Sequence, residues 1–164
     1  ANVSKESVLR LLACLREATL CALQNASPLQ EPSVQLFLHS DGGDAFAGLS
    51  AYDHIARNRV PVTTVADGMV ASAASLMLLA GHRRLAMRHS FVLIHQLSVA
   101  GFEGKYADLL DEVKNSSALM QAFQAIYAER TALTPKRTEQ LLKKELALDA
   151  EVCLREGFVE EILA

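Results

Sequence analysis

The stretch Val60–Gln96, VPVTTVADGMVASAASLMLLAGHRRLAMRHSFVLIHQ, decides how this chain folds. Its pattern predicts a strand over 61–66, a sharp turn at Asp67–Gly68, a helix over 71–80 that opens on Ser72, and two further strands over 85–87 and 91–95. Gly81 is the expected C-terminal cap of the helix. Alternation of short apolar strands with helices is typical of right-handed crossovers in an α/β fold.

The segments on either side continue this alternation. Before it they predict a helix over 4–23, a strand over 34–39 and a helix over 45–58. After it they predict a long helix over 105–130 and two shorter helices over 136–144 and 149–157. A chain of 164 residues is most often one domain, and no repeat or linker divides this one. We therefore predict a single α/β domain over 1–164. The helix over about 105–130 is too long to be covered by so small a domain, and we expect part of it to project or to meet another subunit.

The composition excludes several classes of function. A net charge of −3 and a pI near 6.0 give no general attraction to nucleic acid or to anionic membranes, and tryptophan is absent. The longest apolar run is too short to cross a bilayer. Cys14, Cys21 and Cys153 have no ligand spacing, so we expect three buried or half-buried thiols and no metal site.

Two polar residues stand at the ends of predicted apolar elements. Ser72 opens a helix and His95 ends a strand. A serine hydroxyl needs a base to become a nucleophile, and the free N–H groups at a helix start favour a developing oxyanion. Ser75 lies one helical turn further on, inside the helix, where it lacks such donors. Alone, His95 would be interpreted as a core histidine with satisfied hydrogen bonds, but together with Ser72 and the glycine turn described next it indicates nucleophilic catalysis.

A glycine pair provides a second possible oxyanion site. Gly42 and Gly43 follow the strand over 34–39 within the turn Ser40-Asp-Gly-Gly-Asp44. Such a pair is compatible with an ordinary strand-to-helix turn, or with close approach of the backbone to a ligand. An oxyanion needs two donors, and the sequence offers one at Gly43 and another at Ala73.

These motifs together resemble those of the Clp proteolytic subunit (ClpP) family of self-compartmentalising serine peptidases. The resemblance extends from about Ser33 to Leu163. It is carried by four blocks of sequence, which are Ser40-Asp-Gly-Gly-Asp44, Ala47-Gly-Leu-Ser-Ala-Tyr-Asp53, Gly68-Met-Val-Ala-Ser72 and Ile94-His-Gln96. It implies a ClpP/crotonase-like fold of stacked β-sheet with crossover helices, in which 105–130 forms a protruding handle helix. It also implies that the family's N-terminal strand and pore loop are missing from this sequence.

The resemblance also implies the roles of individual residues. Ser72 falls on the family's nucleophile and His95 on its base, with the Gly43 and Ala73 N–H groups as the oxyanion hole. Counting from either side of the family's third triad position reaches Glu145, where aspartate is usual, and Asp149 is the alternative. The sequence departs from the family pattern at three further positions, which are Asp41, Met69 and Lys144.

The function implied is a serine endopeptidase that needs no cofactor and cleaves unfolded proteins. Its partners would be peptide substrates, further copies of itself in stacked rings, and an ATP-driven (AAA+) unfoldase. The expected location is cytoplasmic, or an organelle matrix or stroma if a transit segment was removed. Three alternatives stay open at this point: a crotonase-type acyl-CoA enzyme, an inactive structural subunit of a Clp-like ring, and a viral-type processing protease.

Overall fold

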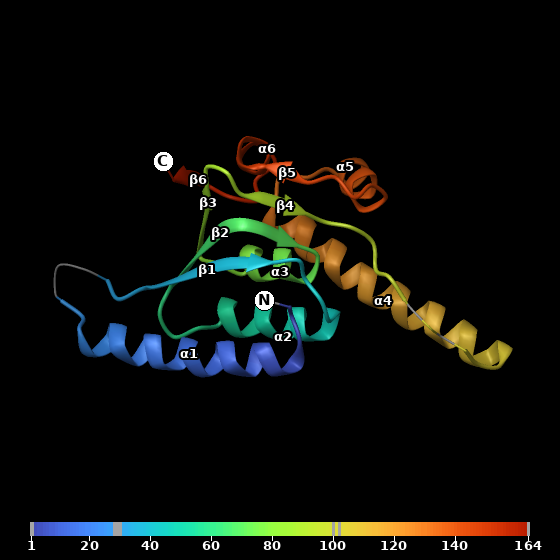
Figure 1. The fold of residues 1–164 in the computed structure, drawn as a ribbon, viewed down its shortest axis with the longest axis horizontal. Helices are drawn as coiled ribbons and strands as arrows, with labels where there is room; N and C mark the ends of the chain where they lie inside the picture. Colours follow the sequence, from blue (N-terminus) through green and yellow to red (C-terminus); the bar gives the residue numbers. More distant parts are fainter. Residues whose placement is uncertain (1, 28–30, 100, 102, 164) are drawn as a thin grey trace.

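The computed structural model describes residues 2–27, 31–99, 101 and 103–163 (Figure 1). Its helices are α1 (Lys5–Gln24), α2 (Ala45–Ala56), α3 (Ala73–Leu79), α4 (Tyr106–Arg130), α5 (Pro135–Leu142) and α6 (Ala150–Arg155). Its strands are β1 (Val34–Ser40), β2 (Val62–Ala71), β3 (Arg83–Met87), β4 (Phe91–Leu93), β5 (Leu148–Asp149) and β6 (Glu161–Leu163). The order agrees with the predicted α/β class.

Strand β2 is the centre of the sheet. It pairs in parallel with β1 along most of its length, with β3 over 63–66 and with β4 over 69–71. Since β1 occupies one edge of β2, β3 and β4 share the other edge in succession. Strand β6 continues the sheet beyond β3, and β5 pairs antiparallel with β4. The C-terminal ends of β1, β2 and β4 therefore lie close together.

The sharp turn predicted at Asp67–Gly68 is wrong. Strand β2 runs through both residues, and its pairing with β1 shifts from Leu38↔Ala66 to Ser40↔Val70. Gly68 has a φ of 81°, so it accommodates the additional residues as an irregularity within the strand. A side chain there would lie 2.8 Å from the imidazole ring of His39, which fills the adjacent space.

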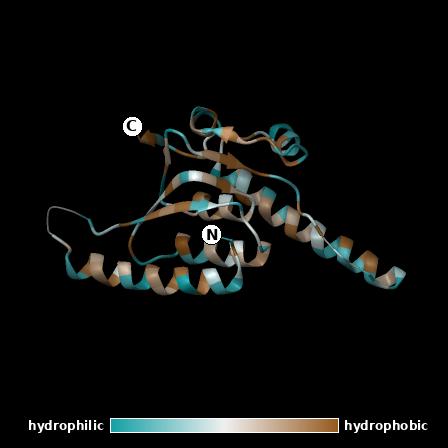
Figure 2. Cartoon of the chain, viewed as in Figure 1, coloured by the Kyte–Doolittle hydropathy of each residue, from teal (hydrophilic) through white to brown (hydrophobic). Residues whose placement is uncertain are grey.

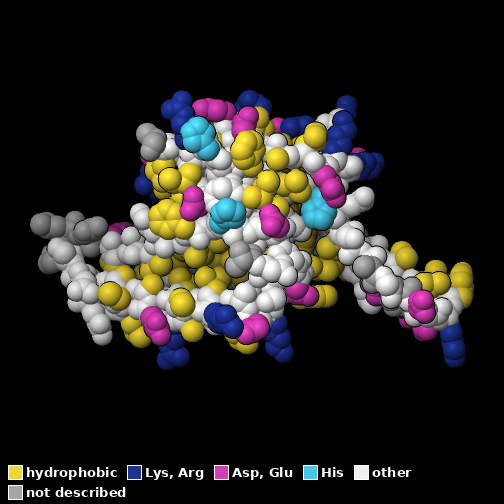
Figure 3. All heavy atoms as spheres, viewed as in Figure 1, with side chains coloured by type: hydrophobic (Ala, Val, Ile, Leu, Met, Phe, Trp, Pro, Cys, Tyr) yellow, Lys and Arg dark blue, Asp and Glu magenta, His cyan; other side chains and the backbone are white. Residues whose placement is uncertain are grey.

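The core lies between the sheet and the helices α2 and α3. Every residue of α3 is buried, α2 packs on α3, and α1 packs on α2 (Figure 1). Helix α1 is only partly covered, with Leu9 and Leu20 exposed, and hydrophobic side chains are visible above it in Figure 3. The expectation of buried or half-buried thiols is wrong for Cys14 and Cys21, which are exposed on α1, and correct for Cys153.

Helix α4 extends away from the rest of the molecule, as predicted for 105–130 (Figure 1). Its described buried residues, Phe123 and Tyr127, lie near its C-terminal end. The projecting part carries exposed large side chains, which are Tyr106, Leu109, Leu110 and Val113. Figure 2 shows hydrophobic segments along this part of the helix. Within the described residues, no helix is long and apolar enough to cross a membrane.

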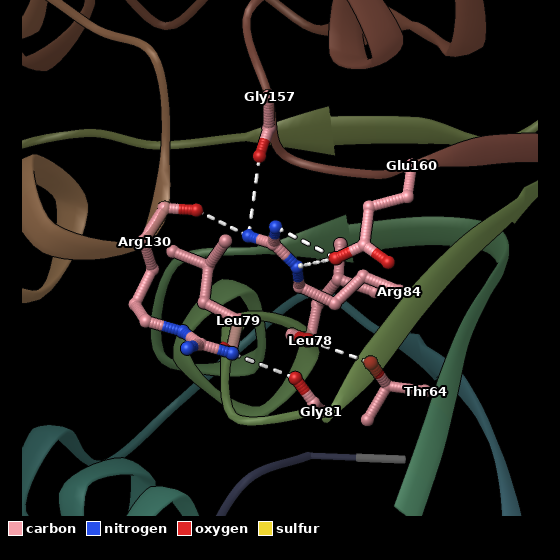
Figure 4. Close-up of polar contacts among 8 residues, drawn as sticks. All are labelled: Thr64, Leu78, Leu79, Gly81, Arg84, Arg130, Gly157 and Glu160. Atoms are coloured by element: carbon pink, nitrogen blue, oxygen red, sulfur yellow. Dashed lines mark hydrogen bonds and ion pairs between the residues drawn. The ribbon is translucent and has the colours of Figure 1, made fainter.

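Two arginines fix the base of α4 to the sheet (Figure 4). Arg130 donates from Nε to the Leu79 carbonyl (2.9 Å) and from Nη2 to the Gly81 carbonyl (2.7 Å). Arg84 donates to the carbonyl of Arg130 and is paired with Glu160 at 2.9 Å. The last carbonyls of a helix lack partners within the helix, so Arg130 satisfies the Leu79 carbonyl at the end of α3 as well as the Gly81 carbonyl just beyond it.

The prediction that Gly81 caps α3 is wrong. The cap is Ala80, with a right-handed φ of −72°, and Gly81 is absent from the described glycines of positive φ. Gly81 is small for another reason: a Cβ there would lie 2.2 Å from Oγ1 of Thr64. The Thr64 hydroxyl in turn donates to the Leu78 carbonyl (2.7 Å).

Replacing Arg130 by alanine should destabilise the fold. Hydrogen bonds from charged groups contribute more than neutral ones, and we expect the free energy of unfolding to fall by about 2–3 kcal/mol. The control is Arg10→Ala, which removes an ion pair with Glu6 whose two side chains are each 76% exposed. Such pairs contribute little. Denaturant unfolding measures both variants, and equal effects would contradict the anchoring role of Arg130.

Candidate active site

Ser72 joins the end of β2 to the start of α3. Its backbone has φ 53° and ψ −126°. Among the non-glycine residues that the structure describes, Ser72 alone has a positive φ. This conformation costs about 1–3 kcal/mol and persists only where the surroundings impose it. Here the Ser72 N–H donates to the Leu93 carbonyl (2.8 Å), which ties the residue to β4. The side chain is half-buried.

Ser75, the other serine of this segment, is fully buried. Its Oγ donates to the Ser72 carbonyl (2.6 Å) and lies 3.0 Å from the hydroxyl of Tyr127. Burial raises the pKa of Tyr127 to about 12. The Ser75 hydroxyl is thus occupied and has no access to a substrate, in agreement with the sequence argument against it as nucleophile.

The glycine pair lies directly against Ser72. Gly42 has φ 97°, and a Cβ on it would lie 2.6 Å from the Cβ of Ser72 and 2.7 Å from the Ala71 carbonyl. The turn is held from the other side by Val3, whose N–H donates to the Gly42 carbonyl (2.7 Å) and whose carbonyl accepts from the Asp44 N–H (2.8 Å). Only glycine allows the chain to pass this closely.

Two backbone donors beside Ser72 lack acceptors. Within the described part of the chain, neither the Gly43 N–H nor the Ala73 N–H makes a hydrogen bond. Both residues line a cleft of about 310 Å³ that also includes Ser72 and His95. Unpaired N–H groups are uncommon in folded proteins and are typical of sites that bind a negatively charged oxygen.

His95 lies just beyond β4, two residues after the end of that strand, which stops earlier than the sequence predicts. Its side chain is 25% exposed and lines the same cleft as Ser72. Among the described side chains, no hydrogen bond joins the imidazole to the Ser72 hydroxyl. In hydrolases this bond often shortens only in the substrate complex.

The two candidates for the third triad position differ in their contacts. Oε1 of Glu145 lies 3.9 Å from Nδ1 of His95, with a side chain that is 79% exposed. Oδ1 of Asp149 instead accepts from the Val152 N–H (2.8 Å) as the N-terminal cap of α6. The structure thus brings Glu145 next to His95, at a distance too long for a hydrogen bond, and engages Asp149 elsewhere.

Helix α4 forms the other wall of the cleft, which the sequence did not indicate. The lining residues are spaced by one helical turn and become more apolar toward the base of the helix: Glu112, Ser116, Leu119 and Phe123. The Ser116 hydroxyl donates to Oε1 of Glu112 (3.2 Å). Among the described residues, no group of three or more His, Cys, Asp or Glu side chains could hold a metal ion.

Comparison with known proteins gives consistent matches. The family model described as Clp protease matches residues 8–164. An ATP-dependent Clp protease proteolytic subunit of Deinococcus radiodurans is 31% identical over 148 residues, covering 89% of this chain and 71% of the relative. Among solved structures, a point mutant of ClpP1 from Listeria monocytogenes superposes with a TM-score of 0.82 at 21% identity, covering 99% of this chain and 86% of the other. At that identity the structural match shows a shared fold.

Proposed function

The chain belongs to the Clp protease family, and we propose on that premise that it hydrolyses peptide bonds through an acyl-enzyme on Ser72. The family resemblance and the ClpP-like fold predicted from the sequence are confirmed. Membership makes the chain a peptidase subunit, and the crotonase alternative is not favoured. The serine mechanism and the residues that carry it are our proposal.

One observation supports this proposal most strongly. The cleft brings together a strained serine, a histidine and two N–H groups without acceptors, contributed by Ser72, His95, Gly43 and Ala73. These are the three components of acyl transfer: a nucleophile, a base and an oxyanion hole. An inactive structural subunit would have no need to keep all three in one place.

The proposed reaction proceeds in two steps. His95 removes the proton from the Ser72 hydroxyl as Oγ attacks the substrate carbonyl carbon, and the Gly43 and Ala73 N–H groups stabilise the oxyanion. The imidazolium then donates its proton to the leaving amine, and the acyl-enzyme forms. Water, activated by His95, hydrolyses the ester and regenerates Ser72.

Glu145 is proposed to orient His95 through Nδ1. We expect Glu145→Gln to lower kcat by about 10-fold or more, since loss of the carboxylate leaves the imidazolium without its charge partner. Asp149→Asn is the matched control and should leave kcat within about twofold, because an amide oxygen still caps a helix. Peptide hydrolysis measures both. A larger loss in Asp149→Asn than in Glu145→Gln would reverse the assignment.

The assembly is proposed to be a set of stacked rings, with the projecting part of α4 at the contact between rings. The exposed apolar side chains of α4 support this, because such groups are usually covered in an oligomer. The relative from Deinococcus radiodurans is described as ATP-dependent. We propose that an ATP-driven unfoldase likewise supplies substrate to this chain.

Size fractionation combined with an assay tests the function and the assembly together. Each fraction of the purified protein is given a short fluorogenic peptide and a denatured protein. We expect peptide hydrolysis, coinciding with a species several times larger than the 17.8 kDa chain. Hydrolysis by the monomer alone would contradict the ring assembly, and an assembled protein without hydrolysis would contradict the peptidase.

A further inference from the structure

We propose that Ser75 and Tyr127 are positioning residues that aim the Ala73 N–H into the oxyanion hole. This inference rests on the proposed function, since it concerns one of the two oxyanion donors. It assigns a role in the reaction to two buried hydroxyl groups that do not touch the cleft. It also connects the long helix α4, which carries Tyr127, to the geometry at Ser72.

The peptide bond between Ser72 and Ala73 links the buried hydroxyl groups to the oxyanion donor. In a trans peptide the carbonyl and the N–H point in opposite directions from one rigid plane. The Ser72 carbonyl and the Ala73 N–H belong to the same plane, so fixing the first fixes the second. The carbonyl accepts from Ser75 twice, from Oγ at 2.6 Å and from the backbone N–H at 2.9 Å. The Ala73 N–H is thereby directed away from these two donors.

The direction of each hydrogen bond follows from the donors available. A carbonyl oxygen can only accept, so the single hydroxyl proton of Ser75 is used in the bond to Ser72. In the 3.0 Å contact between the two hydroxyls, Tyr127 must then donate and Ser75 must accept. Burial raises the pKa of Tyr127 to about 12, so its proton remains in place throughout the neutral range.

The resulting chain runs from Tyr127 through Ser75 to the Ser72 carbonyl. Hydrogen bonds in such a chain polarise one another when they are shielded from water. Both hydroxyl-bearing residues are buried, with Ser75 0% and Tyr127 1% exposed. Electron withdrawal from the carbonyl makes the N–H of the same peptide a better donor. The chain therefore favours both the orientation and the strength of the Ala73 donor.

A purely structural role must be distinguished from this one. Serines inside helices often donate to the carbonyl of the preceding turn without any further consequence. The turn between β3 and β4 contains a comparable pattern: Ser90 is 2% exposed, and its Oγ (2.8 Å) and its N–H (3.0 Å) both donate to the Met87 carbonyl. Ser90→Ala removes a comparable bond away from the cleft and is the control for lost packing and lost hydrogen bonding.

The experiment compares Tyr127→Phe, Ser75→Ala and Ser90→Ala in the assembled protein. For the first two we expect kcat for peptide hydrolysis to fall by about 10- to 50-fold with KM within about twofold, less than the full loss of an oxyanion donor. A peptide boronic acid, whose tetrahedral adduct occupies the oxyanion hole, should lose affinity in proportion to kcat. Ser90→Ala should change neither value, whatever its effect on unfolding temperature.

The outcomes separate this inference from the proposed function. If Ser72→Ala is inactive while Tyr127→Phe and Ser75→Ala keep full kcat, the positioning role is wrong and the peptidase stands. If Ser72→Ala retains hydrolysis, the proposed function itself fails. A loss of kcat in Ser90→Ala equal to that in Tyr127→Phe would mean that the effect is general destabilisation, and would overturn the inference. Ser75→Ala decides the matter if Tyr127→Phe does not fold.

Discussion

Replacing Ser72 by alanine is expected to lower kcat for peptide hydrolysis by at least about 10³-fold, with assembly and stability unchanged. The hydroxyl is the proposed nucleophile, and the nearby Ser75 cannot replace it, because Ser75 is buried and bonded to Tyr127. The change to alanine also removes little packing, because Ser72 is only half-buried. Hydrolysis of a fluorogenic peptide measures the effect.

The corresponding change at the base provides the control. His95→Ala should be as damaging as Ser72→Ala, and the double variant should be no worse than either single one, because the two groups act in the same step. Additive losses would indicate that the residues act independently. A Ser72→Ala variant with more than a few per cent of the original kcat would contradict the mechanism.

Gly42→Ala is expected to lower kcat by about 100-fold, the range seen when an oxyanion donor is lost. The added Cβ would lie 2.6 Å from the Cβ of Ser72 and 2.7 Å from the Ala71 carbonyl, so the turn or the nucleophile must move. The φ of 97° also disfavours any side chain. The donor at Gly43 is displaced in either case. Steady-state kinetics on the assembled protein measures the loss.

Gly101→Ala is the matched control for strain alone. Gly101 also has positive φ, 67°, but a Cβ there would meet no atom of the described residues within 4 Å. We expect a small loss of stability and kcat within about twofold of the parent. If Gly101→Ala were as damaging as Gly42→Ala, close packing of the glycine turn on Ser72 would not be the cause.

The sequence predicted the centre of the fold well because strong local signals are concentrated there. Apolar runs bounded by Gly42, Gly81 and Pro61 define the strands and α3, and the order of elements leads to the α/β class. The errors arose where glycine was interpreted too narrowly. Gly68 lies within a strand irregularity instead of a turn, and Gly81 is required by the side chain of Thr64 instead of by a helix cap.

The candidate site was predictable only in part. Ser72, His95 and Gly43 each stand at the end of an element, and the carboxyl ends of neighbouring parallel strands converge. The hydrogen bonds that distant residues make to the site could not be predicted from the sequence. Val3 bonds to Gly42, and Tyr127 bonds to Ser75, from remote positions in the chain. The exposure of Cys14 and Cys21 could likewise not be predicted from the sequence, because a thiol fits either side of an amphipathic helix.

Covalent labelling with a fluorophosphonate probe, followed by mass spectrometry of the digested protein, tests directly whether Ser72 is the nucleophile. We expect one phosphonyl group on the peptide that contains Ser72, on the Ser72 side chain, and no label on the Ser72→Ala variant. The assembled protein should react, and denatured protein should not. Absence of labelling in the assembled protein, or labelling that persists in Ser72→Ala, would show that Ser72 is not the nucleophile.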